Sequence, residues 1–316
     1  MVNVKNIMFA VYGVTNSQQT KQFMEDFGLK TSHTESGRTY IRGSCKYSFI
    51  YCAEEAKTPG LRTIGFELAS RDDLDRATKL PGASAILPFQ RPGGGEYVVT
   101  EMPGGIAIEL VYGNQKVEPL AVRAALPLNE GEHKKRFNIT QRPPRTTCEV
   151  MRLGHLAIGV PDPEAARDWV IKHIGMRTSD TIMVPGNKDE PIGFFMRFDH
   201  GDIPVDHHTL LLTKSSGTAA VHHISFELQD LDAVYMGHEW MQAKGHKSHW
   251  GVGRHVLGSQ IFDYWWDPDG FRVEHYTDGD LFDNTVEARV VEGTNDQLWT
   301  WGPHVPETFF VETRHT

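Results

Sequence analysis

Alternating apolar and polar residues predict short strands at regular intervals along the chain. In residues 220–228, Ile224 and every second residue after it are apolar, and His223 begins the opposite face. Residues 154–160 repeat this pattern, with His155 opposite to the apolar positions and next to small residues on its own face. Each of these strands therefore offers one apolar face to a core and one histidine to whatever lies on the other side.

A third predicted strand adds a carboxylate to the two histidines. In residues 271–276, Phe271 and Val273 form the apolar face, and Glu274 falls on the opposite face. Two imidazoles and one carboxylate are the ligands of a facial metal site that leaves coordination positions open. We therefore predict that His155, His223 and Glu274 bind one metal ion.

Helical periodicity follows the first histidine strand. Asp162 is a predicted N-cap with Pro163 at the first helical position, and apolar residues then recur at helical spacing until Gly175. A second helix is predicted over residues 231–244, ended by Gly245. Extended segments are predicted after the first helix, at residues 182–184, 192–198 and 208–213.

The chain contains an internal repeat. Residues 64–75 resemble residues 224–232, and residues 102–109 match residues 267–274. Four modules result, at about 5–55, 60–113, 150–215 and 219–280, and each has the order strand, helix, then two or three strands. We predict an α+β fold of four βαβββ modules paired into two domains, whose curved mixed sheets form a funnel.

The repeat also predicts the domain organisation. Residues 1–113 would form an N-terminal domain without metal, and residues 150–280 a catalytic, metal-binding domain. Residues 114–149 are rich in proline and charge and are predicted to be a linker. The tail, residues 281–316, is rich in aromatic residues, so we expect it to pack near the active site.

Comparison of the two halves serves as an internal control. The alignment puts Met8 in the place of His155, Thr63 in the place of His223, and Glu109 in the place of Glu274. Both histidines are therefore confined to the second half. We expect the first half to be structural and to bind no metal.

Composition excludes several other classes of function. The net charge is −9 and there is no basic run, which argues against binding of nucleic acid. The sequence has no apolar stretch long enough to cross a membrane and no apolar signal region at its start, so we predict a cytoplasmic protein. Three cysteines are too few and too scattered for a disulfide framework.

Three further polar residues fall on segments expected to line the same funnel. His208 precedes His223, and both His255 and Tyr264 precede Glu274. Taken singly, each is more readily interpreted as a surface or core residue, and only their convergence suggests a role. His222 should face away from His223, which favours a place in the core or behind the ligand.

This pattern resembles the type I extradiol ring-cleaving dioxygenases of the vicinal oxygen chelate superfamily, such as catechol 2,3-dioxygenase and 2,3-dihydroxybiphenyl 1,2-dioxygenase. The most specific part is residues 262–274, which are similar to the family's signature around its ligand glutamate. The resemblance covers nearly the whole chain and implies the glyoxalase-like fold. The segment of residues 196–207 looks longer than in some members, so the residues of the pocket wall are not assigned from the resemblance.

The resemblance also implies roles for individual residues. His155, His223 and Glu274 would bind Fe(II), or Mn(II) as in a few members, with O2 as co-substrate. His208 would assist oxygen activation and proton transfer, while His255 and Tyr264 would hydrogen-bond and help to deprotonate the catechol hydroxyls. The expected reaction is extradiol ring cleavage of an aromatic diol in aromatic compound catabolism. The product would be yellow and of the 2-hydroxymuconic-semialdehyde type, and the enzyme a homodimer or homotetramer.

Two alternatives stay open at this point. A glyoxalase-like isomerase or a lyase would use the same paired modules, but those enzymes often take ligands from both halves, and Met8 and Thr63 speak against that. A metal-free protein that sequesters a flat ligand would have no use for the two histidines and the glutamate. Neither alternative fits the residue pattern as well as an extradiol dioxygenase.

Overall fold

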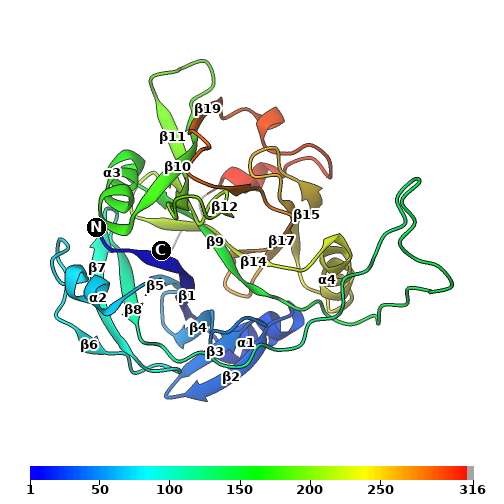
Figure 1. Ribbon diagram of the computed structural model, residues 1–316, viewed down its shortest axis with the longest axis horizontal. Coiled ribbons are helices and arrows are strands. Elements are labelled where there is room, and N and C mark those ends of the chain that lie inside the picture. Colours follow the sequence, from blue (N-terminus) through cyan, green and yellow to red (C-terminus); the bar gives the residue numbers. More distant parts are fainter. Residues whose placement is uncertain (312–316) are drawn as a thin grey trace.

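The protein is organised around two large curved sheets that lie side by side, with the helices on their outer sides (Figure 1). The computed structural model describes residues 1–311. The first sheet has the strand order β2-β3-β4-β1-β5-β8-β7-β6, and the second has the order β15-β16-β17-β14-β9-β13-β11-β10-β19. Strands β12 and β18 form a separate small sheet.

The first half contains the following elements, in chain order: β1 (Val4–Val14), α1 (Ser17–Asp26), β2 (Lys30–Glu35), β3 (Arg38–Arg42), β4 (Tyr51–Glu55), β5 (Gly60–Leu68), α2 (Arg71–Ala77), β6 (Leu87–Pro88), β7 (Glu96–Met102) and β8 (Ile106–Tyr112). The second half continues with β9 (Arg152–Val160), α3 (Pro163–Trp169), η1 (Val170–Ile174), β10 (Met176–Met183), β11 (Pro191–Phe198), β12 (Val205–Asp206), β13 (Leu210–Lys214), β14 (Ala220–Glu227), α4 (Leu231–Ala243), β15 (Ser248–Arg254), β16 (Ile261–Trp266) and β17 (Arg272–Thr277). The tail holds β18 (Leu281–Phe282), β19 (Arg289–Glu292), η2 (Asn295–Gln297) and η3 (Glu307–Phe310).

The four-module architecture predicted from the repeat is confirmed. The first strands of the two modules in each half are antiparallel neighbours at the centre of the sheet, β1 with β5 and β9 with β14. Each of these strands also pairs in parallel with the last strand of its own module, namely β4, β8, β13 or β17. The fold is therefore α+β, with a βαβββ unit used four times.

Local sequence explains the helix that follows β9. The side chain of Asp162 accepts a hydrogen bond from the amide of Ala165, so the predicted N-cap is correct. The last turn is a π-helix that ends at Gly175, whose φ of 79° lies in the left-handed region that favours glycine. Strand β10 then begins at Met176, earlier than the predicted residue 182, because Met176 already pairs with Phe198 of β11.

Strand pairing corrects one part of the internal comparison. Phe9 pairs with Gly65 in the first half, just as His155 pairs with Ser225 in the second half. The counterpart of His155 is therefore Phe9, and the assignment of Met8 was wrong by one residue. Both strands carry the same irregularity, between Ile7 and Phe9 in β1 and between Leu153 and His155 in β9, so the two halves correspond residue by residue here.

The other two equivalences are confirmed. Thr63 pairs with Ala107 as His223 pairs with Arg272, and Glu109 pairs with Gly65 as Glu274 pairs with Ser225. At these equivalent positions the first half has a threonine where the second has a histidine, and both halves have a glutamate. The difference between the halves is one of residue type, since the backbone positions correspond.

One continuous apolar core joins the two sheets. The ring of Tyr12 on β1 packs edge-on against Phe271, with 5.6 Å between the ring centroids, and the amide of Thr15 donates to Asp269. The division into domains at residues 113 and 150 stays a prediction, because this core runs across both halves. None of the helices in residues 1–311 is long and apolar enough to span a membrane.

The predicted linker and tail behave differently from each other. Much of residues 123–146 is exposed, and this segment projects from the body as an arm (Figure 1). The described part of the tail, residues 281–311, in contrast runs back along the second sheet: β19 pairs with β10, and Phe309 is buried against Trp250 and Tyr264. Residues 312–316 of the predicted tail lie outside the described residues. Segments far apart in the sequence are therefore brought to the same face of the second sheet.

Candidate metal centre

His155, His223 and Glu274 converge from three neighbouring strands of the second sheet. The Nε2 atom of His155 lies 3.2 Å from Nε2 of His223 and 3.1 Å from Oε2 of Glu274. The Nε2 atom of His223 lies 3.5 Å from the same carboxylate oxygen. All three residues are buried, on β9, β14 and β17, and they form a group with the side chains that a metal ion needs.

The spacing of these donor atoms fits one metal ion. Three cis ligands with bonds of about 2.1 Å stand about 3.0 Å from one another, and the observed separations are close to that value. Within residues 1–311 the Oε1 atom of Glu274 has no hydrogen-bond partner although it is buried. A buried carboxylate oxygen without a partner is costly, and a cation would remove that cost.

The protonation state of Glu274 also suits a cation. Burial by itself raises the pKa of this carboxyl, but the contacts with His155 and His255 and the neighbouring imidazoles outweigh burial, so the pKa lies well below its usual value. Ser225, which pairs with Glu274 across β14 and β17, donates its hydroxyl to Oε2. Glu274 is therefore held as an oriented carboxylate.

A second histidine sets the tautomer of His223. The Nδ1 atoms of His222 and His223 lie 2.7 Å apart, and Nε2 of His222 lies 2.6 Å from the carbonyl oxygen of Phe309. Burial and Arg272 lower the pKa of His222 to about 3, so its ring is neutral. Because a carbonyl only accepts, His222 donates from Nε2 and accepts at Nδ1 from His223. The Nε2 of His223 then carries a lone pair toward Glu274, as a metal ligand requires.

The adjacent histidines reach the same side because β14 is irregular there. Its register against β9 shifts between Val221 and His223, so strict alternation fails at His222. His222 was expected to face away from His223. That expectation was wrong, because both rings line the same cavity. The expectation that it lies behind the ligand agrees with its contact to Phe309.

His208 lies beside the three candidate ligands. Its ring centroid is 4.2 Å from that of His155 and 4.8 Å from that of Phe195. Burial, together with His155 and His207, lowers the pKa of His208 well below its usual value, so the ring is neutral. A neutral imidazole next to the metal position can accept a proton.

Tyr264 and His255 form a second polar pair on the wall of the same cavity. The Tyr264 hydroxyl lies 2.9 Å from Nε2 of His255, and Nδ1 of His255 lies 2.7 Å from the carbonyl oxygen of Leu298. Since that carbonyl only accepts, His255 donates from Nδ1 and its Nε2 accepts from the tyrosine. Burial and then Glu274 raise the pKa of Tyr264 well above its usual value, so the phenol keeps its proton.

These residues surround a cavity of about 610 Å³. That volume suits a small organic molecule, because ligand pockets of this kind measure about 300–1,000 Å³. The wall is mainly apolar and is contributed by β10, β11, β13, β14, the loop between β15 and β16, and the tail: Ile182, Ile192, Phe195, Leu211, Val221, Leu257, Leu298, Phe309 and Phe310. All six residues predicted from the sequence as ligands or catalytic groups line this cavity or, in the case of Glu274, lie directly beneath it.

The corresponding place in the first half is filled. Phe9 packs against Phe49 and Phe89, and the guanidinium of Arg91 lies over the rings of Phe9 and Phe89. Arg91 also forms an ion pair with Glu109, the counterpart of Glu274. An arginine therefore balances the retained carboxylate in the first half, where the second half offers two imidazoles.

Four residues around the site were missed or only partly assigned from the sequence. No role was predicted for Asp180, His207 and Arg289, and His222 was given only a place in the core or behind the ligand. Two of them belong to His-His pairs, at 207–208 and 222–223, and both pairs contact through their Nδ1 atoms. The doubled histidines were a usable signal. Asp180 and Arg289 had none, since a strand aspartate and a tail arginine are ordinary surface residues in most sequences.

Comparison with known proteins gives a family match for part of the second half. Residues 152–275 match the profile described as the Glyoxalase/Bleomycin resistance protein/Dioxygenase superfamily. Among curated proteins, metapyrocatechase 2 of Cupriavidus necator is 34% identical over 163 residues, which are 51% of this chain and 48% of that protein. The chain thus matches about half the length of this relative.

Solved structures share the fold over nearly the whole chain. Homoprotocatechuate 2,3-dioxygenase of Brevibacterium fuscum, in complex with 3,4-dihydroxyphenylacetate, superimposes with a TM-score of 0.79 at 19% identity, covering 98% of this chain and 92% of that one. The Mn(II)-bound glyoxalase of Novosphingobium aromaticivorans gives a TM-score of 0.80 at 20% identity, covering 98% and 94%. Fold alone therefore does not separate a dioxygenase from a glyoxalase.

Proposed function

We propose that this chain, whose residues 152–275 match the Glyoxalase/Bleomycin resistance protein/Dioxygenase superfamily profile, is an extradiol dioxygenase that cleaves a catechol-type diol with O2. One observation supports this above the others. Three donor atoms at 3.1–3.5 Å from one another lie at the floor of an apolar cavity whose wall carries a neutral histidine and a tyrosine–histidine pair. The similarity to metapyrocatechase 2 adds support from sequence.

In this proposal His155, His223 and Glu274 hold Fe(II), with Mn(II) as the alternative ion. All three residues come from one half of the repeat, and a set of two imidazoles and one carboxylate would leave the ion able to take further ligands from the cavity. When bound, the ion supplies a centre at which a diol and O2 can meet.

Tyr264 and His255 would take part in deprotonating the diol. The tyrosine hydroxyl already donates to Nε2 of His255, so a proton that reaches the tyrosine oxygen can be passed on to that nitrogen. The carbonyl of Leu298 keeps His255 in the tautomer that accepts at Nε2. The pair thus moves a proton away from the diol and stabilises the anionic form that binds a cation more tightly.

His208 would act on the other side of the bound ring. Its neutral imidazole, beside His155 and Phe195, can accept a proton during turnover and return it as the ring opens. The apolar wall, which includes Phe195 and Phe309, would pack against the aromatic ring and exclude water from the site.

The first half argues against the glyoxalase-like alternative. An isomerase that takes ligands from both halves would need donors at Phe9 and Thr63, and a phenylalanine ring offers none. A metal-free sequestering protein would leave two imidazole nitrogens and a carboxylate crowded within 3.5 Å of one another without a cation. Both alternatives are weaker than ring cleavage on these grounds.

The test is a ring-cleavage assay on reconstituted protein. The chain is loaded with Fe(II) without oxygen, mixed with catechol or 3-methylcatechol, and exposed to air. The proposal expects a yellow product of the 2-hydroxymuconic-semialdehyde type and uptake of one O2 per ring. Isomerisation of a hemithioacetal without oxygen uptake would favour a glyoxalase-like isomerase. Tight binding of catechol without turnover would favour a protein that sequesters its ligand.

Assembly and location belong to the same proposal. A homodimer or homotetramer in the cytoplasm is expected, and mass photometry of purified protein measures the assembly directly. The choice between Fe(II) and Mn(II) is measured by metal analysis of protein purified without added metal.

A further inference from the structure

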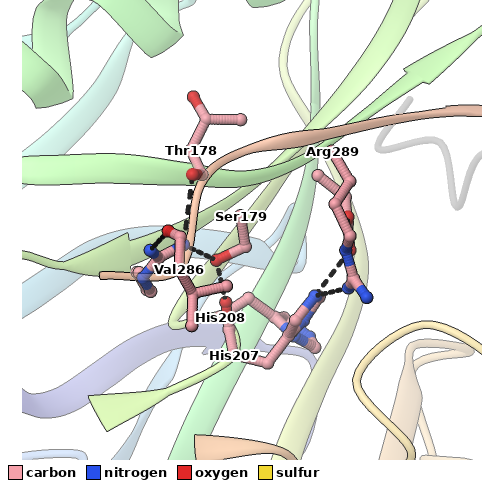
Figure 2. Close-up of polar contacts among 8 residues, drawn as sticks. Thr178, Ser179, His207, His208, Val286 and Arg289 are labelled. Atoms are coloured by element: carbon pink, nitrogen blue, oxygen red, sulfur yellow. Dashed lines mark hydrogen bonds and ion pairs between the residues drawn. The ribbon is translucent and has the colours of Figure 1, made fainter. Parts of the chain in front are cut away.

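A chain of four polar side chains runs from the tail to the cavity. Arg289 on β19 donates to both carboxylate oxygens of Asp180 on β10, at 2.7 and 2.8 Å. Asp180 Oδ2 lies 2.6 Å from Nε2 of His207, and Nδ1 of His207 lies 3.0 Å from Nδ1 of His208. Figure 2 shows the side chains of Arg289 and His207 pointing toward each other.

Each contact in this chain fixes the direction of the next. Two donors from Arg289 and the imidazole of His207 outweigh the effect of burial and lower the pKa of Asp180, so this carboxylate accepts only. His207 must then donate from Nε2. A neutral imidazole has a single N–H, so Nδ1 of His207 is left as an acceptor, and His208 must donate to it from Nδ1.

The charged groups around His207 are already matched. Asp180 is fully buried with one negative charge, and Arg289 supplies one positive charge in a bidentate ion pair. We take His207 as a ring with a single N–H, which it directs at Asp180. A second N–H on this ring would reverse the direction of the contact with His208.

The position of His207 is fixed by its surroundings. Ser179 donates its hydroxyl to the His207 carbonyl at 2.5 Å and in turn accepts from Arg197 at 2.8 Å (Figure 2). Arg197 also donates to the carbonyls of Thr178 and Val286, which ties β10 to the tail. The ring of His207 packs between Phe195 and Phe282, with centroid distances of 5.2 and 5.4 Å.

We propose that Asp180 and Arg289 act through His207 as positioning residues that hold His208 in its Nδ1–H tautomer, leaving an unprotonated Nε2 for the cavity. His208 would then enter each turnover as a proton acceptor. The role of His208 in turnover rests on the proposed function. The tautomer of His208 is a property of the resting protein and can be tested without it. The proposal also assigns a role to β19, because Arg289 pairs with Asp180 in register across the two strands.

The tautomer can be measured without any activity. The full chain is labelled with 15N in the histidine rings and loaded with Zn(II), a diamagnetic ion that takes nitrogen and carboxylate ligands. Long-range proton–nitrogen correlation spectra show which ring nitrogen of each histidine carries the proton, and a His208→Gln sample identifies the signals of His208. The expected result is a protonated Nδ1 and an unprotonated Nε2 for His208. A protonated Nε2 in the native protein would overturn the proposal.

His207→Phe tests the relay itself. This change keeps a ring between Phe195 and Phe282 but removes both nitrogens, so His208 loses its acceptor. We expect the Nδ1–H tautomer of His208 to lose its dominance, and kcat on catechol to fall about tenfold or more. KM for catechol and the metal content should stay within about threefold, since neither depends on that proton. His33→Phe, the same change at an exposed position, should alter none of these quantities.

The outcomes separate this proposal from the proposed function. A folded His207→Phe protein with native tautomer and native kcat would refute the relay and leave ring cleavage standing. If the protein shows no ring cleavage at all, the spectrum of His208 still decides whether the relay exists. If His207→Phe fails to fold, the spectrum of the unaltered chain is sufficient to contradict or support the assignment.

Discussion

Removal of a single oxygen atom, by Tyr264→Phe, tests the acid–base part of the proposed mechanism. The hydroxyl donates to Nε2 of His255 at 2.9 Å on the wall of the cavity, while the ring packs against His223, Trp250 and Phe309. The substitution keeps these ring contacts. It therefore deletes one proton-transfer group and leaves the shape of the cavity unchanged.

The expected loss is large compared with the structural cost. A positioned acid–base group contributes about 10²–10⁴-fold to rate, which corresponds to about 2.7–5.5 kcal/mol of barrier. Loss of one hydrogen bond to the neutral acceptor of His255 costs about 1 kcal/mol of stability, which a typical domain tolerates. The hydroxyl is outside the candidate ligand set, so the metal should remain bound.

The assay combines steady-state kinetics on catechol, metal analysis and thermal unfolding. We expect kcat/KM to fall at least about 100-fold with metal content unchanged. Tyr51→Phe is the matched control, because it removes a buried hydroxyl in the first half that has no hydrogen-bond partner within residues 1–311. A Tyr264→Phe enzyme with native kcat/KM would refute the proton-transfer role, and loss of metal would move the tyrosine into the ligand set.

Three further predictions concern metal binding and stability. His222→Phe removes the acceptor that orients His223, so metal affinity should fall about 10–100-fold in a titration monitored by calorimetry, and unchanged affinity would contradict the orienting role. Chelation of the metal should lower the unfolding temperature, because an ion bound at 100 times its Kd stabilises the folded chain by about 2.7 kcal/mol; an unchanged melting curve would speak against a site in the folded core. Burial raises the pKa of Asp267 to about 7, so the folded chain holds a proton that the unfolded chain releases near pH 4, and stability should decrease as the pH rises from about 4 to 7. In Asp267→Asn the side-chain amide oxygen can still accept from the backbone amides of Asp269 and Phe271. The difference in unfolding free energy between pH 5 and pH 8, measured by urea unfolding, should therefore become smaller in this variant. An unchanged difference would contradict the assignment.

Much of the site could be predicted from sequence because strand alternation and the repeat are local signals. His155, His223 and Glu274 each lie opposite to the apolar positions of their own strands, and the structure brings their donor atoms within 3.5 Å. The capping residue Asp162 was equally predictable, since a helix start depends on only a few neighbouring residues.

The two errors had different causes. The register shift in β14 near His222 displaces a side chain relative to strict alternation. Such a shift depends on the partner strand β9, which lies more than fifty residues away, so alternation within β14 does not report it. The assignment of Met8 came from aligning β1 with β9 one residue out, since both strands carry the same irregularity, between Ile7 and Phe9 and between Leu153 and His155.

The contribution of the tail could not be predicted for a different reason. Its role depends on main-chain carbonyls, at Leu298 and Phe309, and every residue type provides such a carbonyl. Arg289 likewise gains its meaning only when β19 pairs with β10. Aromatic composition indicated that the tail would pack, but the residues it orients emerge only from three-dimensional contacts.

The most direct test of the account is a matched pair of substitutions at the two equivalent glutamates. Glu274→Gln and Glu109→Gln make the same change in the second and the first half of the repeat, and each protein is reconstituted anaerobically with Fe(II) before catechol and air are added. We predict that Glu274→Gln loses both iron and the yellow product. Glu109→Gln should keep both, even if loss of its ion pair with Arg91 lowers stability. Full iron content and full activity in Glu274→Gln would contradict the central claim.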